Sequence, residues 1–368
     1  SVKSVPYSGY VDDGIGYIKL SRFTRNCSKD MKNAIEDLKK IAELKGLILD
    51  LRSNPGGLLQ ESVSIVNLFV EKGEQVVSTK GKIKAWEKSY IANSNPLDTK
   101  VPLVVLINSS SASASEIVSG SIQDLDRGVV VGQRSYGKGL VQQTRKLSYN
   151  SQLKLTVAKY YIPSGRCIQA LDYSNRNEDG SVGKIEDSLT TAFQTKNGRE
   201  VFDGGGISPD IITEAGTVSN VVISLFTERL FFDYATDFRF ENDSIIKNFI
   251  FSDSNYEHFE KYLSGKEYAY KTKTEEALEK LKDQATAENY FESLNDEYEA
   301  FSTQLIANKG DDLFTHKKEI KEVLTGEIRS RYYYQVGRIE AALNFDTDLK
   351  KAIEVLQDEG AYNSILGN

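Results

Sequence analysis

The hydrophobic pattern of this chain of 368 residues changes near residue 215, and this change restricts the fold more than any other feature. Before it, short apolar runs such as Leu47–Leu51 and Pro102–Asn108 alternate with helical patterns and glycine-rich turns. After it, almost the whole chain has the spacing of helices. Because parallel strands need crossovers, this alternation predicts an α/β (α+β) core, a mixed sheet covered by helices, over residues 14–215. Residues 216–368 are expected to form an all-helical C-terminal region.

Within the core, apolar runs predict the strands and periodic apolar residues predict the helices between them. Strands are expected at Gly14–Phe23, Leu47–Leu51, Pro102–Asn108 and Gly128–Gly132, with hairpin-like strands at Val76–Ile91 and at Leu140–Leu147 with Leu153–Ile162. Helices are expected from Ser28 to about Leu44 and from the serine-rich segment to about Asp124. Residues 1–13 are polar and irregular, and they predict a linker from a missing upstream module.

Amphipathic patterns in the C-terminal region leave two interpretations of its helices. The apolar residues of one stretch are separated by three and four positions, and so are those of the next: Phe291, Leu294, Tyr298, Phe301, Leu305, then Ile320, Val323, Leu324, Ile328. The simpler interpretation is that these helices pack on each other or on the core. The alternative is a homo-oligomer formed through them.

Charge and residue counts exclude several classes of protein. The net charge of -7 argues against nucleic acid as a partner, which basic patches would bind. Two cysteines and two histidines, His258 and His316, argue against metal sites, so we expect no metal and no cofactor. The apolar runs are too short to span a bilayer. Both histidines lie in charged helical surroundings, so a Ser-His-Asp triad is not expected.

A serine-rich segment after the strand Pro102–Asn108 holds the candidate nucleophiles, among them Ser111, Ser113 and Ser115. A serine where a strand runs into a helix lies beside the N–H groups of the helix start, which can hold an oxyanion. The structural alternative is a capping box, since Ser113 precedes Glu116 by three residues. The motif alone favours capping.

With histidine set aside, the base for such a serine would be a lysine, which can act as a base where burial lowers its pKa. Lys138 lies between two glycines at the start of a predicted strand. If that strand includes Lys138, Gln142 lies on the same face and could orient the amine. A solvated lysine in a turn is the simpler alternative. The Gly56-Gly57 turn after Leu47–Leu51 could supply N–H donors for an oxyanion, or it could be an ordinary loop.

Three segments, taken in order, strongly resemble the C-terminal processing peptidases, also called tail-specific proteases. They are LDLRSNPGGLL, SSSASASEIVSG and GQRSYGKGLVQ. The downstream segments YYIPSGRCIQ and GGGISPD also resemble that family. The resemblance covers roughly residues 14–215. It implies a crotonase-like core with a small β subdomain, preceded by a PDZ domain for which residues 1–14 leave no room.

The resemblance also implies an activity and assigns roles to residues. It implies a serine endopeptidase that cleaves proteins near their C-termini, with Ser113 as nucleophile and Lys138, 25 residues later, as base. Gln142 matches the glutamine four residues beyond the lysine. The implied oxyanion donors are the backbone N–H groups of Gly56, Gly57 and Ala114. The resemblance gives Ser111 and Ser115 no role as nucleophile. Unstructured C-terminal tails are the implied substrates, and a periplasmic or cell-envelope location is the implied compartment.

Two other functions stay open at this point. One is a peptide-binding or scaffold protein on the same fold, in which the dyad is not assembled. The other is a crotonase-like acyl-thioester enzyme, because a fold does not fix a function. That enzyme would need a catalytic carboxylate, and Glu116 is the only nearby candidate.

Overall fold

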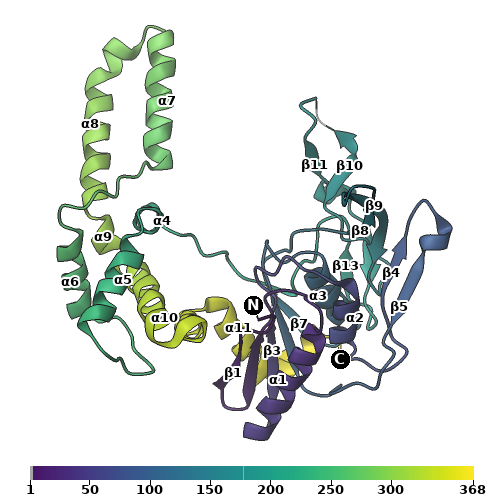
Figure 1. The fold of residues 1–368 in the computed structure, drawn as a ribbon. Helices are drawn as coiled ribbons and strands as arrows, with labels where there is room; N and C mark the ends of the chain where they lie inside the picture. The colour runs from purple at the N-terminus through teal and green to yellow at the C-terminus, as the bar shows by residue number, and fades with distance from the viewer. Residues whose placement is uncertain (1–2, 177) are drawn as a thin grey trace. The chain divides into compact units, whose positions relative to one another are not determined.

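The computed structural model describes residues 3–176 and 178–368, which form two compact units (Figure 1). Unit 1 contains the described residues up to Ala215 together with Thr347–Asn368. Unit 2 contains Gly216–Asp346.

A six-stranded sheet forms the centre of unit 1, in the order β1-β2-β3-β6-β7-β14. β1 and β2 are antiparallel and the other neighbouring pairs are parallel, which confirms a mixed sheet. Every residue of β3, β6 and β7 is buried, as expected for parallel strands covered on both faces. The strands are β1 (Tyr7–Asp12), β2 (Ile15–Lys19), β3 (Gly46–Asp50), β6 (Leu103–Ile107), β7 (Val129–Gly132) and β14 (Ile211–Ile212).

Three helices cover one face of this sheet: α1 (Cys27–Ile41), α2 (Leu59–Val66) and α3 (Ala114–Asp124). The sequence predicts one apolar face of Met31, Ile35, Leu38 and Ile41 for α1. The first three are buried against strand residues, whereas Ile41, the last residue of the helix, is exposed. α3 is buried along its whole length, so the segment that carries the candidate nucleophiles is held rigidly in the core.

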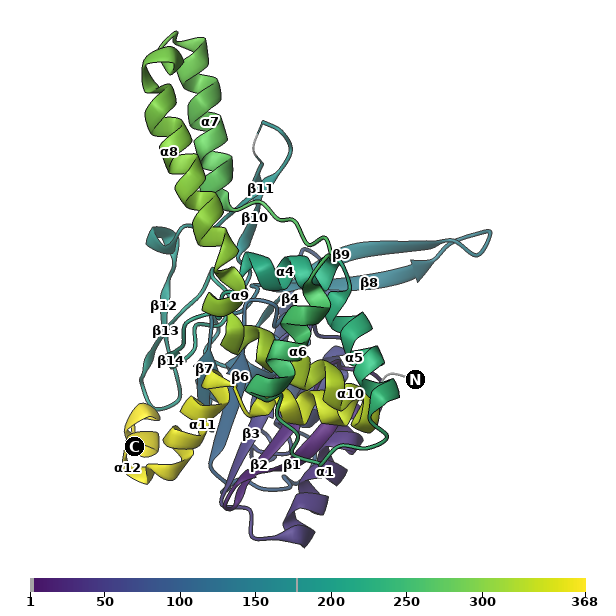
Figure 2. The same ribbon diagram turned by 90° about the vertical axis from the view of Figure 1, so that its left-hand side faces the viewer.

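The opposite face is covered by the end of the chain, α11 (Thr347–Gln357) and α12 (Glu359–Ile365), drawn in yellow in Figure 2. The Tyr362 hydroxyl accepts a hydrogen bond from the Leu103 N–H at 2.9 Å. A Cβ on Gly46 would lie 3.2 Å from the side chain of Leu356. The expectation of one C-terminal region over 216–368 is therefore corrected. Thr347–Asn368 belongs to unit 1 because its apolar residues fill the uncovered face of the sheet.

The polar segment at the start of the chain forms an edge strand that its sequence pattern did not predict. β1 pairs with β2 from Tyr7 to Asp12, and the Tyr10 hydroxyl donates to the carbonyl groups of Leu38 and Ala42 at 2.9 Å each. The predicted linker over residues 1–13 is thus wrong for Tyr7–Asp12. An edge strand exposes one side to solvent, so it carries little of the apolar alternation that marks a strand in a sequence.

A second, four-stranded sheet in the order β5-β4-β9-β8 forms most of the small β part of unit 1. Both predicted hairpin regions are confirmed as antiparallel pairs, β4 with β5 and β8 with β9. Its strands are β4 (Gln75–Lys80), β5 (Lys88–Ile91), β8 (Leu140–Lys146) and β9 (Gln152–Tyr161), with the 3-10 turn η1 (Lys84–Trp86) before β5. Two small hairpins follow: β10 (Leu171–Arg176) with β11 (Val182–Lys184), and β12 (Ala192–Gln194) with β13 (Glu200–Phe202), the 3-10 turn η2 (Asp187–Leu189) lying between them.

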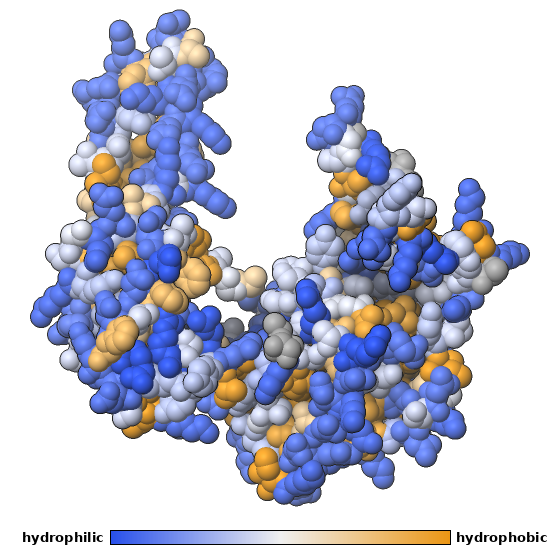
Figure 3. All heavy atoms as spheres, viewed as in Figure 1, coloured by the Kyte–Doolittle hydropathy of each residue, from blue (hydrophilic) through white to orange (hydrophobic). Residues whose placement is uncertain are grey.

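Unit 2 is helical, as its sequence predicts, and its core is rich in aromatic rings. Tyr234 packs edge-on against Phe251 and Phe259, and Phe231 stacks on Phe259. α7 and α8 form a hairpin whose surface in Figure 3 is mostly hydrophilic, with hydrophobic atoms between the two helices. The helices are α4 (Asn220–Thr227), α5 (Leu230–Glu241), α6 (Asp253–Leu263), α7 (Lys273–Ala287), α8 (Phe291–Gly310), α9 (Asp312–Thr315) and α10 (Lys317–Leu343).

Candidate active site

Parallel pairing brings the three motif segments to one edge of the central sheet. β3, β6 and β7 all end there, and each is followed by one of the segments singled out in the sequence. Carboxyl ends of parallel strands are where α/β proteins place their binding loops. The three motifs, which are far apart in the sequence, therefore lie in neighbouring loops at this edge.

The backbone at Ser113 sets this residue apart from the other serines. Its φ of 59° and ψ of -111° lie in a region that side chains with a Cβ rarely adopt. Strain of this kind persists where the surrounding structure fixes it, and it is concentrated at functional sites. Ser113 is half-buried and lies immediately before α3, so its hydroxyl can meet a ligand at the helix start.

Ser111 and Ser115 have structural roles instead. The Ser111 hydroxyl donates to the Leu51 carbonyl and the Ser115 hydroxyl donates to the Asn54 carbonyl, both at 2.9 Å. Both side chains are fully buried. They fasten the serine loop to the turn after β3. Of these three serines, Ser113 therefore remains as the candidate nucleophile.

The glycine turn lies directly against Ser113. A Cβ on Gly56, whose φ is 95°, would come within 2.6 Å of the Ala112 carbonyl oxygen and 2.9 Å of the Ser113 Cβ. Only glycine allows both this backbone angle and this approach. The Gly56 N–H donates to Asn54 Oδ1 at 2.9 Å, so it is already in use. In the described part of the chain no partner is found for the N–H groups of Gly57 and Ala114, so these two are free to donate to a ligand.

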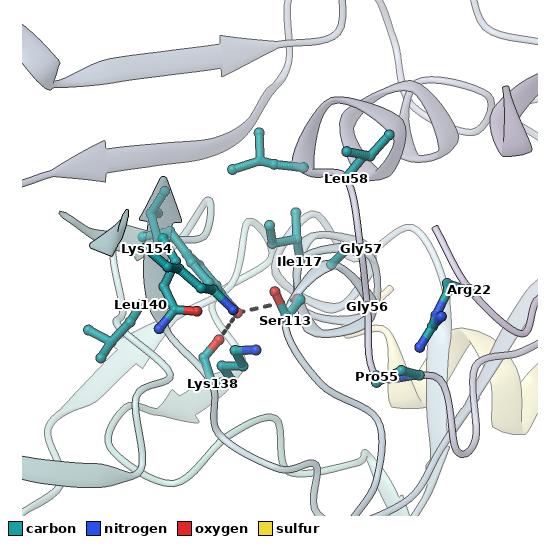
Figure 4. A pocket seen from close by; sticks show the side chains of 15 residues that line it. Arg22, Pro55, Gly56, Gly57, Leu58, Ser113, Ile117, Lys138, Leu140 and Lys154 are labelled. Carbon is teal, nitrogen blue, oxygen red and sulfur yellow. Dashed lines mark hydrogen bonds between the residues drawn. The ribbon is translucent and has the colours of Figure 1, made fainter. Parts of the chain in front are cut away.

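A cavity of about 480 Å³ joins these elements, and Ser113, Lys138 and Gln142 all line it (Figure 4). Lys138 precedes β8 rather than lying within it, because the strand begins at Leu140. Among the described residues no hydrogen bond joins the Ser113 hydroxyl to the Lys138 amine, and none fixes the Gln142 amide. The three predicted side chains thus share one cavity without direct contact between nucleophile and base. Catalytic hydrogen bonds are often long before substrate binds.

The Glu116 side chain connects the segment of Ser113 to the segment of Lys138. It is fully buried, and one carboxylate oxygen accepts the N–H groups of Ser113 at 2.7 Å and Lys138 at 2.9 Å. The other oxygen accepts the Gly137 N–H and the Ser135 hydroxyl, both at 2.6 Å. Burial raises the pKa of Glu116, although each of these bonds favours the charged form. The capping role predicted for Glu116 accounts for only one of its four bonds.

Tyr160 is a site residue that sequence reasoning missed. This buried tyrosine of β9 donates to the Lys138 carbonyl and lies 3.2 Å from the Ser113 carbonyl oxygen, as the dashed lines in Figure 4 indicate. Burial raises its pKa well above the usual value, so the hydroxyl stays protonated. Tyr160 is the first residue of the segment YYIPSGRCIQ, but the resemblance carried by that segment assigned it no role.

An ionic network holds the end of β3 under the glycine turn. Asp50 is fully buried, receives the Tyr17 hydroxyl at 2.5 Å, and pairs with Arg52 at 2.8 Å. Burial opposes ionisation of Asp50, but the charges of Arg52 and Lys19 outweigh it and hold the pKa of this carboxyl below its usual range. Arg52 also pairs with Asp348 of α11 at 3.0 Å. No group of three histidine, cysteine or acidic side chains in the described residues is arranged to hold a metal ion.

Together these features define a class of site, in which a serine nucleophile, an amine and backbone N–H donors surround one cavity at a sheet edge. Such a site can carry out acyl transfer through a covalent intermediate. Residues 14–174 match the model of peptidase family S41. Residues 221–356 match the family "Probable PDZ-protease, C-terminal helical domain", a likeness that the sequence motifs did not indicate.

Named relatives agree with this family. A carboxy-terminal-processing protease of Bartonella bacilliformis is 45% identical over 173 residues, which are 46% of this chain and 39% of that protein. A chloroplastic C-terminal processing peptidase of Tetradesmus obliquus is 36% identical over 166 residues, 45% of this chain and 35% of that protein. This chain therefore spans less than half the length of these two relatives.

Among solved structures, a photosystem II D1 C-terminal processing protease matches with a TM-score of 0.41 and 30% identity, over 54% of this chain and 42% of that chain. None of the helices in the described part of the chain has the length and hydrophobicity that a membrane crossing requires.

Proposed function

We propose that this chain carries the catalytic core of a serine endopeptidase that cleaves proteins near their C-termini through an acyl-enzyme. The observation that carries the proposal is the shared cavity, in which Ser113 and Lys138 lie beside the N–H groups of Gly57 and Ala114. The names of the relatives support the same activity.

In the proposed reaction, Ser113 Oγ attacks the scissile carbonyl while neutral Lys138 Nζ takes its proton. The lysine then passes the proton to the leaving amine, and water hydrolyses the acyl-enzyme. Gln142 orients the amine when substrate closes the cavity. The N–H groups of Gly57 and Ala114 hold the developing oxyanion, and loss of one such donor typically costs about 10²–10³ in rate.

The proposed substrate is an unstructured tail that adds as a strand beside β8. β8 pairs only with β9 and forms the edge of the second sheet. Its residues Leu140, Val141 and Gln142 line the cavity, so a strand added there would run past Ser113. Strand addition supplies main-chain hydrogen bonds without requiring a particular sequence.

Two further parts of the proposal concern assembly and location. Copies of the chain are proposed to associate through unit 2, where Leu281, Leu294 and Phe301 are exposed on the α7–α8 hairpin. Sedimentation of the purified chain tests this. A periplasmic or cell-envelope location is proposed from the likeness to tail-specific proteases alone, and cell fractionation tests it.

One observation favours a second candidate, a peptide-binding protein without activity: the described structure joins Ser113 and Lys138 by no hydrogen bond. Cleavage of an unstructured protein decides between the two. We expect Ser113→Ala and Lys138→Ala to lower the rate at least about 10³-fold, as loss of a catalytic group does in other serine peptidases.

Ser110→Ala is the matched control, because Ser110 is an exposed serine of the same loop. We expect this variant to retain full activity. Cleavage by Ser113→Ala at the unmodified rate, or no cleavage by the unmodified chain, would remove the peptidase proposal and leave the binding protein.

A further inference from the structure

The walls of the catalytic cavity carry three basic side chains, one of them the proposed base Lys138, and no carboxylate. Arg22, Lys138 and Lys154 are among the fifteen residues that line it, and none of the fifteen is Asp or Glu. The chain as a whole has the opposite sign, with a net charge of -7. The positive charge of this cavity is therefore a local feature and does not follow from the composition.

These cations have no partners of their own. In the residues that the structure describes, no hydrogen bond or ion pair is formed by the side chains of Arg22, Lys138 or Lys154. Two less exposed arginines of unit 1 are paired with carboxylates, Arg52 with Asp50 and Arg166 with Asp124. Glu116 lies under the site, but its two oxygens already accept four donors. An anionic ligand would complete the pairing.

The backbone at Arg22 is held beside the Gly56-Gly57 turn by the next residue, Phe23. Phe23 bridges Gly57, its N–H donates to the Gly56 carbonyl at 3.1 Å, and its carbonyl accepts the Leu58 N–H at 2.9 Å. In Figure 4 Arg22 lies on one side of Ser113. Its guanidinium can therefore meet a substrate group that flanks the scissile bond on that side.

In Figure 4 Lys154 lies on the side of Ser113 away from Arg22. It is held on β9 opposite Thr144 of β8, the strand that we propose as the docking edge. Because Lys138 is assigned to proton transfer, Arg22 and Lys154 are the two cations left for recognition. Both residues are exposed, so their attraction to a carboxylate is weakened by salt.

We propose that Arg22 and Lys154 bind carboxylates of the peptide, so that the cavity selects anionic tails with a carboxylate within a few residues of the scissile bond. The inference rests on the proposed peptidase function for the identity of the ligand as a peptide. An acidic side chain and the terminal carboxylate of a tail offer the same chemistry to the two cations.

Peptide binding to the Ser113→Ala protein tests this without any need for catalysis. The probes are rhodamine-labelled peptides of Ala, Gly and Ser around one Leu, which carry either Asp or Asn at each position that flanks the Leu. Each peptide is made with a free and with an amidated C-terminus. Fluorescence anisotropy gives the dissociation constants at low and at high salt.

We expect the Asp peptide to bind about 5–10-fold more tightly than its Asn counterpart at low salt, and the preference to shrink at high salt. Arg22→Gln and Lys154→Gln should each lower the preference to about twofold or less. Lys146→Gln should leave it unchanged, because Lys146 is exposed on the same hairpin and does not line the cavity. If amidation of the C-terminus instead weakens the Asp and Asn peptides alike, the cations bind the terminal carboxylate.

Equal binding of the Asp and Asn peptides with free and amidated ends, an unchanged preference in both variants, or no binding at all would overturn the proposal. The unmodified protein is tested for cleavage of the same peptides in parallel. Selective binding without cleavage would retain the carboxylate site and refute the peptidase function. Cleavage without selectivity would do the reverse.

Discussion

At the scale of single residues, Glu116 determines how the site is held together. Its spacing from Ser113 predicts a capping box, and the bond to the Ser113 N–H confirms that half of the prediction. The bonds to Ser135, Gly137 and Lys138 could not be predicted, because those residues meet Glu116 only when β7 pairs beside β6. The family resemblance selected Ser113. The segment YYIPSGRCIQ, which begins at Tyr160, gave Tyr160 no role, because the contacts of its hydroxyl form only in the folded chain.

Replacing Glu116 by Gln is expected to lower kcat about 10–100-fold and to change KM little. An amide offers one acceptor oxygen in place of two and turns an NH₂ group towards backbone donors, so the Ser113 and Lys138 segments would shift. A displacement of about 1 Å at a catalytic site can cost about 10²-fold. Because burial disfavours the charged carboxylate, the loss of stability should be small, about 1–2 kcal/mol. Steady-state kinetics and urea unfolding measure both quantities.

Glu275→Gln is the control for this variant. Glu275 forms the capping box of α7 with Thr272, in unit 2. The same chemical change there should cost some stability and leave kcat as it is. If Glu116→Gln retained full kcat, the positioning role assigned to Glu116 would be wrong.

At the scale of elements, the site depends on how each strand of the sheet ends. The sequence predicted the buried strands β3, β6 and β7, because short continuous apolar runs bounded by turn residues are typical of covered parallel strands. It failed at β1, whose polar edge carries no such run. The residues left open whether the Gly56-Gly57 turn supplies N–H donors or is an ordinary loop, and only the structure separates Gly56, whose N–H is bound to Asn54, from Gly57.

Gly56→Ala is expected to abolish activity, at least about 10²-fold, because its Cβ would push the Ala112 carbonyl and Ser113 away from the turn. The matched control is Gly73→Ala. Gly73 has a similar φ of 100°, but nothing lies within 4 Å of an added Cβ. Both variants should lose roughly 1 kcal/mol to backbone strain, and only Gly56→Ala should lose activity. Thermal unfolding and peptide cleavage are the measurements, and equal activity in the two variants would argue against a structural role of the turn in catalysis.

At the scale of the whole molecule, unit 1 is completed by Thr347–Asn368, which are separated from Ala215 by more than 130 residues of unit 2. The amphipathic pattern of α11 indicates a helix with one apolar face but not what that face contacts. Only the structure assigns it to the sheet, where Leu349, Ala352 and Val355 are buried and Asp348 pairs with Arg52. Residue 215 marks the change of pattern along the sequence, but the catalytic unit resumes at Thr347.

A charge introduced into this docked helix should therefore unfold the catalytic unit. Ala352→Glu places a larger, unpaired carboxylate at a position with no exposed surface, which should cost about 3 kcal/mol or more. Trp86 is the only tryptophan of the chain and lies in unit 1, so its fluorescence during urea unfolding reports on this unit alone. Lys350→Glu, which changes an exposed residue of the same helix, should move the midpoint little. If Ala352→Glu left the Trp86 transition in place, α11 would not stabilise the catalytic sheet. The peptidase core would then be complete without the end of the chain.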